Sequence, residues 1–222
     1  VFPLLVDMVD YTRHRASELG VSERLTFGIT TNGTALTEEM ARFFQKQGIK
    51  LLLSVDGDRA THDSHRRMTT GRSSYDTLMA KLPMMKAYQP WQGARITVHP
   101  EHARRVRENV EHLARIGINQ FIIGPATGPY WTEAAMDDYG DSLVEAAKWV
   151  HLMRVAGAPL RLSLVEGKLD SLGGSQQGRW GCGAGRGRAC IDAAGLIYPC
   201  ARVYGVREHR EKWVLGDIWQ GM

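Results

Sequence analysis

The sequence has little cysteine and no long apolar run. Only three of its 222 residues are cysteine, and its purely apolar runs, such as Leu51-Leu52-Leu53, extend over only a few residues. A membrane-spanning helix needs roughly 20 consecutive apolar residues, so the sequence predicts no membrane partner. Three thiols also exclude a disulfide scaffold. We therefore expect the chain to work in a reducing, cytoplasmic setting.

A large excess of one charge is also missing. The chain has 28 lysine and arginine residues against 24 aspartate and glutamate residues, a net charge of +4. The arginines at 104, 105 and 107 are interspersed with glutamates at 101, 108 and 111, a pattern typical of a solvated helix face. The composition, 43% hydrophobic and 23% charged, is that of an ordinary globular protein. We expect no nucleic-acid partner.

Short β-rich runs alternate with amphipathic segments over residues 1–157. Strands are expected at residues 25–31, 49–55, 94–99 and 119–123, with a further strand at 160–165. Helices are expected between them, with N-caps at Thr37, Ser73 and Thr132. Strand–helix–strand crossovers demand parallel pairing, which predicts an α/β fold. Periodicity does not decide between an open doubly wound sheet and part of a barrel.

Three local expectations accompany this pattern. The nearly continuous apolar run at 49–55 is typical of a parallel strand buried on both faces. Residues 58–72 are expected to form a polar loop. Pro83 is expected to kink or shorten the helix that begins after Ser73.

Polar side chains gather where the expected strands end. Asn32-Gly33 and Asp56-Gly57 are strong hairpin signals, but a helix rather than a strand is expected after each. In an α/β fold the functional groups lie at the carboxyl ends of the strands. Those ends carry Thr30, Thr31, Asn32, Ser54, Asp56, His99 and Gly124. His62, Asp63 and His65 could hold a metal, but a polar surface loop is the simpler interpretation.

The three cysteines lie together near the end of the sequence, at positions 182, 190 and 200. Clustered thiols in a reducing setting indicate metal binding or redox chemistry, and thiolates ligate zinc and iron–sulfur clusters. Both usually need four ligands, so the set is either incomplete or includes His209 or a carboxylate. The C-x2-C knuckles of a structural zinc site are absent from the sequence.

Taken in order, these segments resemble the radical S-adenosylmethionine (SAM) enzymes with a C-terminal SPASM extension, of the peptide- or sulfatase-maturase type. The resemblance depends on 30-TTNGTAL-36, on 54-SVDG-57, and on His62-Asp63 with Arg66. It continues in Cys182 to Cys200, which fits C-x(9–15)-G-x4-C, and in 213-WVLGDI-218.

The resemblance implies a partial (β/α)6 TIM-like barrel lacking its first strands (residues 1–157), then a small, irregular, cysteine-containing SPASM segment (158–222). It implies that Thr31, Asn32 and Ser54 line the SAM site and that Asp56 shapes the turn there. Arg66 or Arg95 would pair with the cofactor carboxylate. Cys182 and Cys200 would ligate an auxiliary [4Fe–4S] cluster, and Cys190 would lie in a variable spacer.

The activity implied is reductive cleavage of SAM to a 5′-deoxyadenosyl radical that abstracts a hydrogen atom. The substrate would be a peptide or protein side chain, and an external electron donor would reduce the cluster. The motif C-x3-C-x2-C, which ligates the radical SAM cluster, is absent, as are Gly-Gly-Glu-Pro and the later SPASM cysteines. We therefore expect a fragment cut at both ends, inactive alone, whose radical-cluster ligands lie outside this chain. No catalytic residue is assigned.

Two alternatives stay open. The first is an α/β binding module with a structural zinc site at the three cysteines and His209. The second is a metal-free α/β enzyme that uses Ser54, Asp56 and His99 at the strand ends.

Overall fold

The computed structural model describes residues 2–164, 166, 184, 189–205 and 210–221. The chain divides into two compact units, Val1–Asp170 and Ser171–Met222. No helix in the described part of the chain is both long and apolar enough to cross a membrane. The division expected between residues 157 and 158 stays a prediction.

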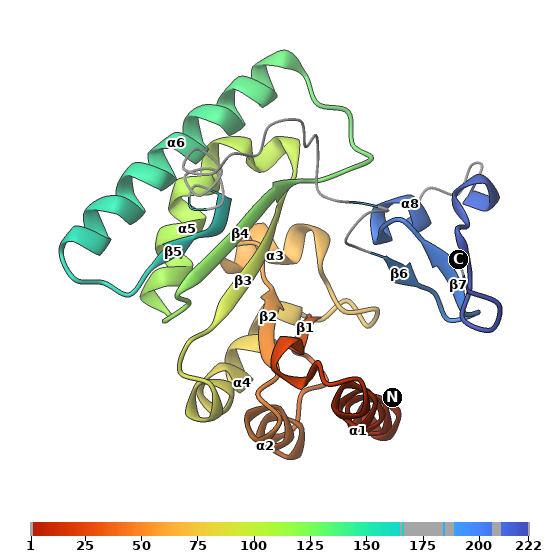
Figure 1. Cartoon of the computed structure of the whole chain (residues 1–222). Coiled ribbons are helices and arrows are strands. Elements are labelled where there is room, and N and C mark those ends of the chain that lie inside the picture. Colours follow the sequence, from red (N-terminus) through yellow and green to blue (C-terminus); the bar gives the residue numbers. More distant parts are fainter. Residues whose placement is uncertain (1, 165, 167–183, 185–188, 206–209, 222) are drawn as a thin grey trace. The chain divides into compact units, whose positions relative to one another are not determined.

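A five-stranded parallel sheet forms the centre of the first unit (Figure 1). Its strands are β1 (Gly28–Thr31), β2 (Lys50–Ser54), β3 (Gly93–Val98), β4 (Gln120–Pro125) and β5 (Arg161–Leu162). Each strand pairs with the next along the chain, in the order β1-β2-β3-β4-β5. A doubly wound sheet reverses its strand order near the middle, and this sheet does not.

Helices connect the strands. They are α1 (Phe2–Glu18), α2 (Glu38–Lys46), α3 (Arg59–His65), α4 (Ser74–Tyr88), α5 (Val106–Arg115) and α6 (Glu133–Val155), with the short 3-10 helices η1 (Ser22–Arg24) and η2 (Pro100–Arg105). The three predicted N-caps are confirmed. Thr37, Ser73 and Thr132 each accept a hydrogen bond from the backbone N–H three residues later.

Two local expectations are wrong, and a third is wrong in part. The segment 58–72 is not simply a polar loop, because Asp58 caps α3 by accepting the Thr61 N–H at 2.8 Å. Pro83 does not shorten α4, which continues to Tyr88, and a kink at Pro83 stays a prediction. The strand expected at 160–165 is only β5, and the chain is helical again at residues 163 and 164.

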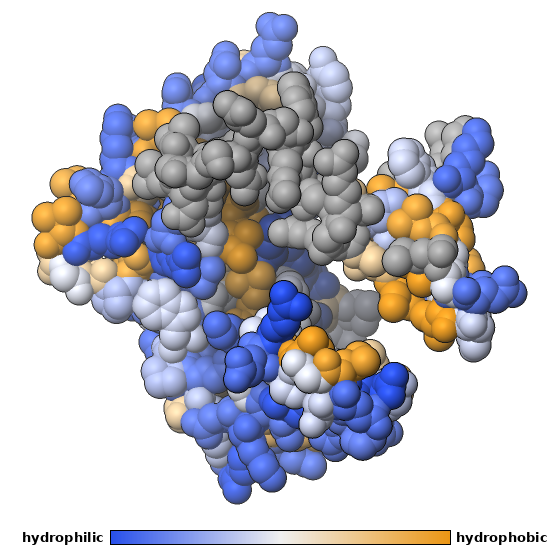
Figure 2. Space-filling view, viewed as in Figure 1, coloured by the Kyte–Doolittle hydropathy of each residue, from blue (hydrophilic) through white to orange (hydrophobic). Residues whose placement is uncertain are grey.

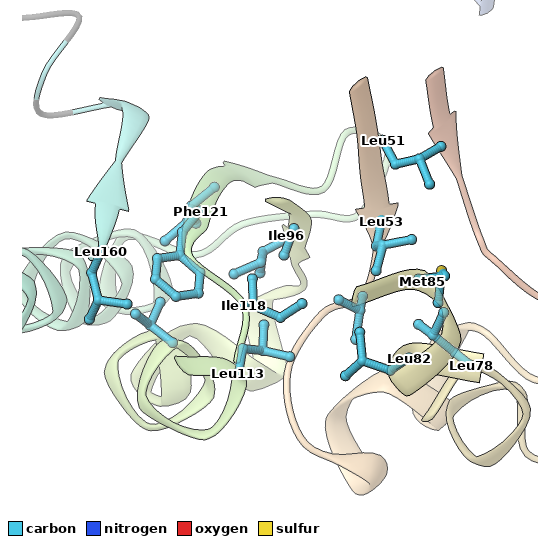
Figure 3. Packing of buried hydrophobic residues seen from close by; sticks show 14 of the residues in the cluster. Leu51, Leu53, Leu78, Leu82, Met85, Ile96, Leu113, Ile118, Phe121 and Leu160 are labelled. Carbon is cyan, nitrogen blue, oxygen red and sulfur yellow. The ribbon is translucent and has the colours of Figure 1, made fainter. Parts of the chain in front are cut away.

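One face of the sheet packs against the helices to form the core (Figure 3). Because side chains alternate along a strand, Leu53 lies on the same face as its register partner Ala94 and, one strand further, Phe121. Leu53 and Phe121 are fully buried. The helix side chains packed in the same cluster come from five helices and include Val9 of α1, Phe44 of α2, Leu78, Leu82 and Met85 of α4, Val110 and Leu113 of α5, and Ala146 and Val150 of α6.

The opposite face of the sheet is open and carries mostly polar side chains. The β2 residues alternate in burial, so the expectation that residues 49–55 are buried on both faces is wrong. Side chains on this open face are half-buried or exposed, namely those of Thr30, Leu52, Ser54, Arg95, Thr97, Gln120 and Ile122. Parallel sheets are normally covered on both faces, so an open polar face marks the side where a ligand or a further part of a protein fits.

The second unit contains a small antiparallel sheet of β6 (Cys190–Ile191), β7 (Leu196–Tyr198) and β8 (Gly216–Asp217), with α8 (Ala201–Gly205) and η3 (Arg210–Trp213). Tyr198 of β7 is buried. Several apolar residues remain exposed on this unit, including Ile191, Ile218 and Trp219, and Figure 2 shows apolar surface gathered there.

Candidate functional site

The parallel sheet brings the predicted site residues to one edge. Thr31 ends β1 and Ser54 ends β2, and the β2–β3 register places Ser54 directly beside Arg95. Ser54 and Arg95 therefore point to the open face of the sheet together. Asn32 follows β1, is exposed, and accepts hydrogen bonds from the Thr34 N–H at 3.2 Å and the Thr34 hydroxyl at 3.0 Å.

Thr31 has a different surrounding. Its register partner is Leu53, so its side chain is on the helix-covered face of the sheet. Its Oγ1 accepts the Gly33 N–H at 3.1 Å, which stabilises the turn after β1. Gly33 has φ +72°, and a Cβ there would lie 2.4 Å from Leu78 Cδ1, so this turn requires glycine. Among the predicted site residues, Thr31 is thus the one whose hydroxyl accepts a hydrogen bond that stabilises the fold.

Asp56 is buried at the centre of a closed hydrogen-bond ring. Its carboxylate accepts from Arg66 Nε at 2.5 Å and Arg66 Nη2 at 3.2 Å, and also from the Thr97 N–H at 2.8 Å. The Asp56 N–H donates to His62 Nδ1 at 3.3 Å. His62 Nε2 is 3.0 Å from Ser74 Oγ, and Ser74 Oγ donates to the backbone carbonyl of Arg66. The ring fixes the turn after β2 to α3 and to the start of α4.

This ring defines the protonation state of His62. A backbone N–H can only donate, so Nδ1 is unprotonated and Nε2 carries the proton that goes to Ser74. Burial lowers the pKa of His62, and the nearby Arg66 acts in the same direction, while Asp56 and Asp63 oppose it. The neutral imidazole is therefore the form that the fold needs. His62 and Asp63 are buried, so the interpretation of this segment as a polar surface loop is wrong.

The lowered pKa of His62 predicts a pH dependence of stability. The unfolded chain takes up the histidine proton near pH 6.5, while the folded chain resists it until a lower pH. The stabilisation by His62 is therefore complete above pH 6.5 and decreases as the pH falls toward the folded pKa. For one proton the slope reaches ~1.4 kcal/mol per pH unit.

Denaturant unfolding between pH 7.5 and 5 measures this slope. His62→Asn keeps an acceptor near the Asp56 N–H but does not titrate, so we expect a flatter profile. His151→Asn, on the exposed part of α6, is the matched control and should leave the profile as it is. Equal slopes in the parent chain and His62→Asn would contradict the assignment.

The two arginines that are candidates to bind the cofactor carboxylate differ in whether their guanidinium groups already have partners within the fold. Arg66 is held by Asp56 and also donates to Thr97 Oγ1 at 3.2 Å. Arg95 is half-buried and makes no ion pair or hydrogen bond with any residue that the structure describes. Its Nη2 lies 3.7 Å from the position that a Cβ on Gly124 would occupy, so Gly124 leaves room for the guanidinium on the open face. Of the two candidate arginines, Arg95 is thus the one that is available to a ligand.

A cleft of about 430 Å³ adjoins the ring. Its wall contains Asn32 and Thr34 from the β1–α2 turn, together with His62, His65, Arg66, Arg67, Met68, Thr69 and Ser74. Of the five predicted cofactor-binding residues, Asn32 and Arg66 line this cleft, whereas Thr31, Ser54 and Asp56 do not. A cleft lined by hydroxyl, amide and guanidinium groups is suited to a polar ligand that carries a negative charge.

Ser74 is a part of the ring that the sequence did not reveal, and the sequence pointed to His62 without indicating its buried place in the ring. The capping pattern at Ser73 locates the start of α4, but nothing in it indicates that Ser74 faces Arg66. His62 stands in a polar segment without apolar periodicity, so its burial has no sequence signal. The ring of His65 stacks on that of His99, a contact that the sequence also did not indicate.

In the second unit, Cys190 in β6 and Cys200 just before α8 are half-buried free thiols. Cys182 and His209, which the metal hypotheses also need, lie outside the described residues. The glycine of the cysteine motif, Gly195, has φ +79° in the β6–β7 turn, and a Cβ there would lie 2.7 Å from the Trp219 ring. The positive φ and the close approach of the Trp219 ring both explain why the residue five positions before Cys200 is glycine.

Comparison with known sequences gives partial matches to sulfatase-maturating enzymes, whereas no family model matches the chain. The chain is 29% identical over 63 residues to the cysteine-type anaerobic sulfatase-maturating enzyme of Clostridium novyi, which is 28% of this chain and 17% of that protein. It is 27% identical over 89 residues to the serine-type anaerobic sulfatase-maturating enzyme of Klebsiella aerogenes, which is 40% of this chain and 22% of that protein.

Solved structures share the fold. The structure of anSMEcpe with bound AdoMet and the Kp18Cys peptide matches 94% of this chain and 60% of its own, with a TM-score of 0.68 and 19% identity. SuiB from Streptococcus suis matches 86% of this chain and 49% of its own, with a TM-score of 0.56 and 15% identity. The chain thus covers less than two thirds of each of these proteins. Sequence and fold together confirm the resemblance to the radical SAM enzymes of the sulfatase-maturating type.

Proposed function

We propose that this chain forms part of a radical SAM enzyme that modifies a peptide or protein side chain. The observation that carries the proposal is the open, polar face of the parallel sheet, where Arg95 lies beside Ser54 without a charged partner among the described residues. An arginine, a hydroxyl and an amide at neighbouring strand ends suit the carboxylate and ribose of SAM.

The strand order supports the barrel part of the proposal. Five parallel strands in chain order, with helices packed on one face, would form an arc of a (β/α) barrel whose interior is the open face. A partial (β/α)6 barrel places its ligand at the carboxyl ends of the strands. The polar groups described above lie at that end of this sheet.

The chain's own residues then divide into two groups. Arg95 would pair with the cofactor carboxylate, and Ser54 and Asn32 would donate or accept hydrogen bonds at its polar ends. Asp56 and Arg66 would hold the turn after β2 in place rather than contact the cofactor directly, since they bind each other. Thr31 would contribute through the β1 turn that it stabilises.

Iron–sulfur chemistry is the second half of the proposal. When SAM is bound beside a reduced [4Fe–4S] cluster, it supplies a 5′-deoxyadenosyl radical for hydrogen abstraction. The sequence contains no cysteine before Cys182, so these 222 residues supply no thiolate ligands for that cluster and we propose that they are inactive alone. Cys182 and Cys200 are the proposed ligands of an auxiliary [4Fe–4S] cluster in a SPASM-like second unit.

A peptide or protein substrate is proposed by analogy with anSMEcpe, which has been solved with a bound peptide. An external electron donor and a cytoplasmic location complete the proposal. Formylglycine formation is not proposed specifically, because the likeness to the sulfatase-maturating enzymes covers only parts of the chain.

Binding rather than turnover tests the site, because turnover needs ligands that the 222 residues lack. Ligand-detected NMR suits the weak binding expected without the cluster. Arg95→Ala should weaken SAM binding about 10- to 100-fold, because a charge-assisted hydrogen bond contributes ~1.5–3 kcal/mol. Methylthioadenosine lacks the amino-acid end, so its binding should be the same in both proteins.

Arg42→Ala is the matched control, since Arg42 forms a surface ion pair with Glu38 on α2. It should bind both ligands like the parent chain. Unchanged SAM binding in Arg95→Ala, or an equal loss for SAM and methylthioadenosine, would refute the assignment of Arg95 to the carboxylate.

A further inference from the structure

Two histidines and a glutamate converge beside the cleft. His65 ends α3, His99 directly follows β3, and Glu101 lies in η2. One possible ligand atom from each of the three lies within 4.8 Å of the others, and no other group of this kind occurs among the described residues. His65 Nε2 is 2.5 Å from Glu101 Oε1. The rings of His65 and His99 stack with centroids 3.5 Å apart and an interplanar angle of 6°.

The backbones that carry these side chains are well anchored. His65 directly precedes Arg66, and the Arg66 side chain is held by hydrogen bonds to the Asp56 carboxylate. His99 follows Val98, whose carbonyl accepts the Ala126 N–H at 2.7 Å, and the His99 carbonyl accepts the His102 N–H at 2.9 Å. Three ligands on such supports need only side-chain rotation to meet at one ion.

The donor atoms in this cluster suit a cation. His65 and His99 each offer an imidazole nitrogen, and Glu101 offers a carboxylate oxygen, all within 4.8 Å of one another. Glu101 is therefore an oxygen ligand beside two nitrogen ligands.

We propose that His65, His99 and Glu101 bind one divalent transition-metal ion, with Zn²⁺ as the best fit. Two imidazoles and one carboxylate, with a fourth position left for water or another ligand, is a common zinc set. Ca²⁺ and Mg²⁺ prefer oxygen ligands throughout, so they fit less well. His65 lines the 430 Å³ cleft, so the ion would lie at the wall of that cleft. This site uses no cysteine and does not depend on the SAM proposal.

The experiment is a calorimetric titration of the full chain with Zn²⁺. Cys182, Cys190 and Cys200 are replaced by serine in every protein so that thiolates do not compete. We expect one ion per chain, and a loss of affinity of about 100-fold or more in His65→Ala and His99→Ala, because even indirect partners of a metal cost 10- to 100-fold. Glu101→Gln keeps the shape of the side chain and should also weaken binding.

His14→Ala and His151→Ala are the controls, since both histidines are exposed and outside the cluster. They should bind Zn²⁺ like the parent. Circular dichroism confirms that each variant is folded. Absence of binding in the cysteine-free chain, or binding that survives loss of both His65 and His99, overturns the proposal. In either case the stacked rings and the His65–Glu101 hydrogen bond would be a metal-free contact.

Discussion

Replacing Arg66 with methionine should lower the free energy of unfolding by about 3–5 kcal/mol, the usual cost of breaking a buried ion pair. Asp56 is only 3% exposed, and the variant leaves its carboxylate with the Thr97 N–H as the remaining donor among the described residues. Arg66 itself is partly exposed, so the cost comes mainly from the stranded carboxylate. Urea unfolding followed by circular dichroism measures the change.

A second substitution separates charge from packing. Asp56→Asn in the Arg66→Met background removes the unpaired charge and should recover part of the loss, although the same change alone should destabilise the parent. Arg104→Met is the matched control, because Arg104 is exposed and pairs with Asp138 at 2.7 Å on the surface. It should cost no more than about 1 kcal/mol. Similar losses of unfolding free energy in Arg66→Met and Arg104→Met would rule out a structural role for the hydrogen-bond ring around Asp56.

The second large effect is expected for Gly57→Ala, on the order of 3 kcal/mol. Gly57 has φ +151°, and a Cβ there would lie 2.1 Å from Asn109 Oδ1. Asn109 is buried, and its side chain accepts the Asp58 N–H at 3.2 Å. Displacing the Asn109 side chain would therefore weaken the hydrogen bond that connects α5 to the start of α3. Backbone strain and overpacking each cost about 1–3 kcal/mol. Thermal and denaturant unfolding measure the sum.

Gly20→Ala provides the comparison. Gly20 has φ +65° with nothing within 4 Å of the added Cβ, so only the backbone cost of about 1–2 kcal/mol applies. In an Asn109→Ala background, Gly57→Ala should cost less than it does in the parent, because the contacts with Asn109 Oδ1 and Cγ are removed and only the one with its Cβ, at 2.7 Å, remains. An effect no larger than that of Gly20→Ala would show that the Gly57 turn rearranges freely.

Local signals predicted most of the first unit. The caps at Thr37, Ser73 and Thr132 are decided by neighbouring residues, because a short polar side chain satisfies a free N–H within its own turn. The strands followed from apolar runs of the right length. The same signals missed α3, because its buried His62 and Asp63 are polar and are stabilised by partners that lie far along the chain.

The candidate site could be located only from the register of the sheet. Ser54 was predicted from its place at the end of a strand, but its neighbour Arg95 follows from β2–β3 pairing, which the sequence does not encode locally. The choice between Arg66 and Arg95 likewise depends on which of them binds Asp56. The predicted roles of Thr31, Asn32, Ser54, Asp56, Arg66 and Cys200 stay predictions, and Cys182 lies outside the described residues.

The outer edge of β1 has a practical consequence for work with this polypeptide. β1 pairs only with β2 among the described residues, so one row of its amide and carbonyl groups is free to add a strand from elsewhere. Exposed edges of this kind promote self-association and misassembly at high concentration. β5 is the other edge of the sheet and pairs only with β4 among the described residues, so self-association of the 222-residue chain would begin at these two edges.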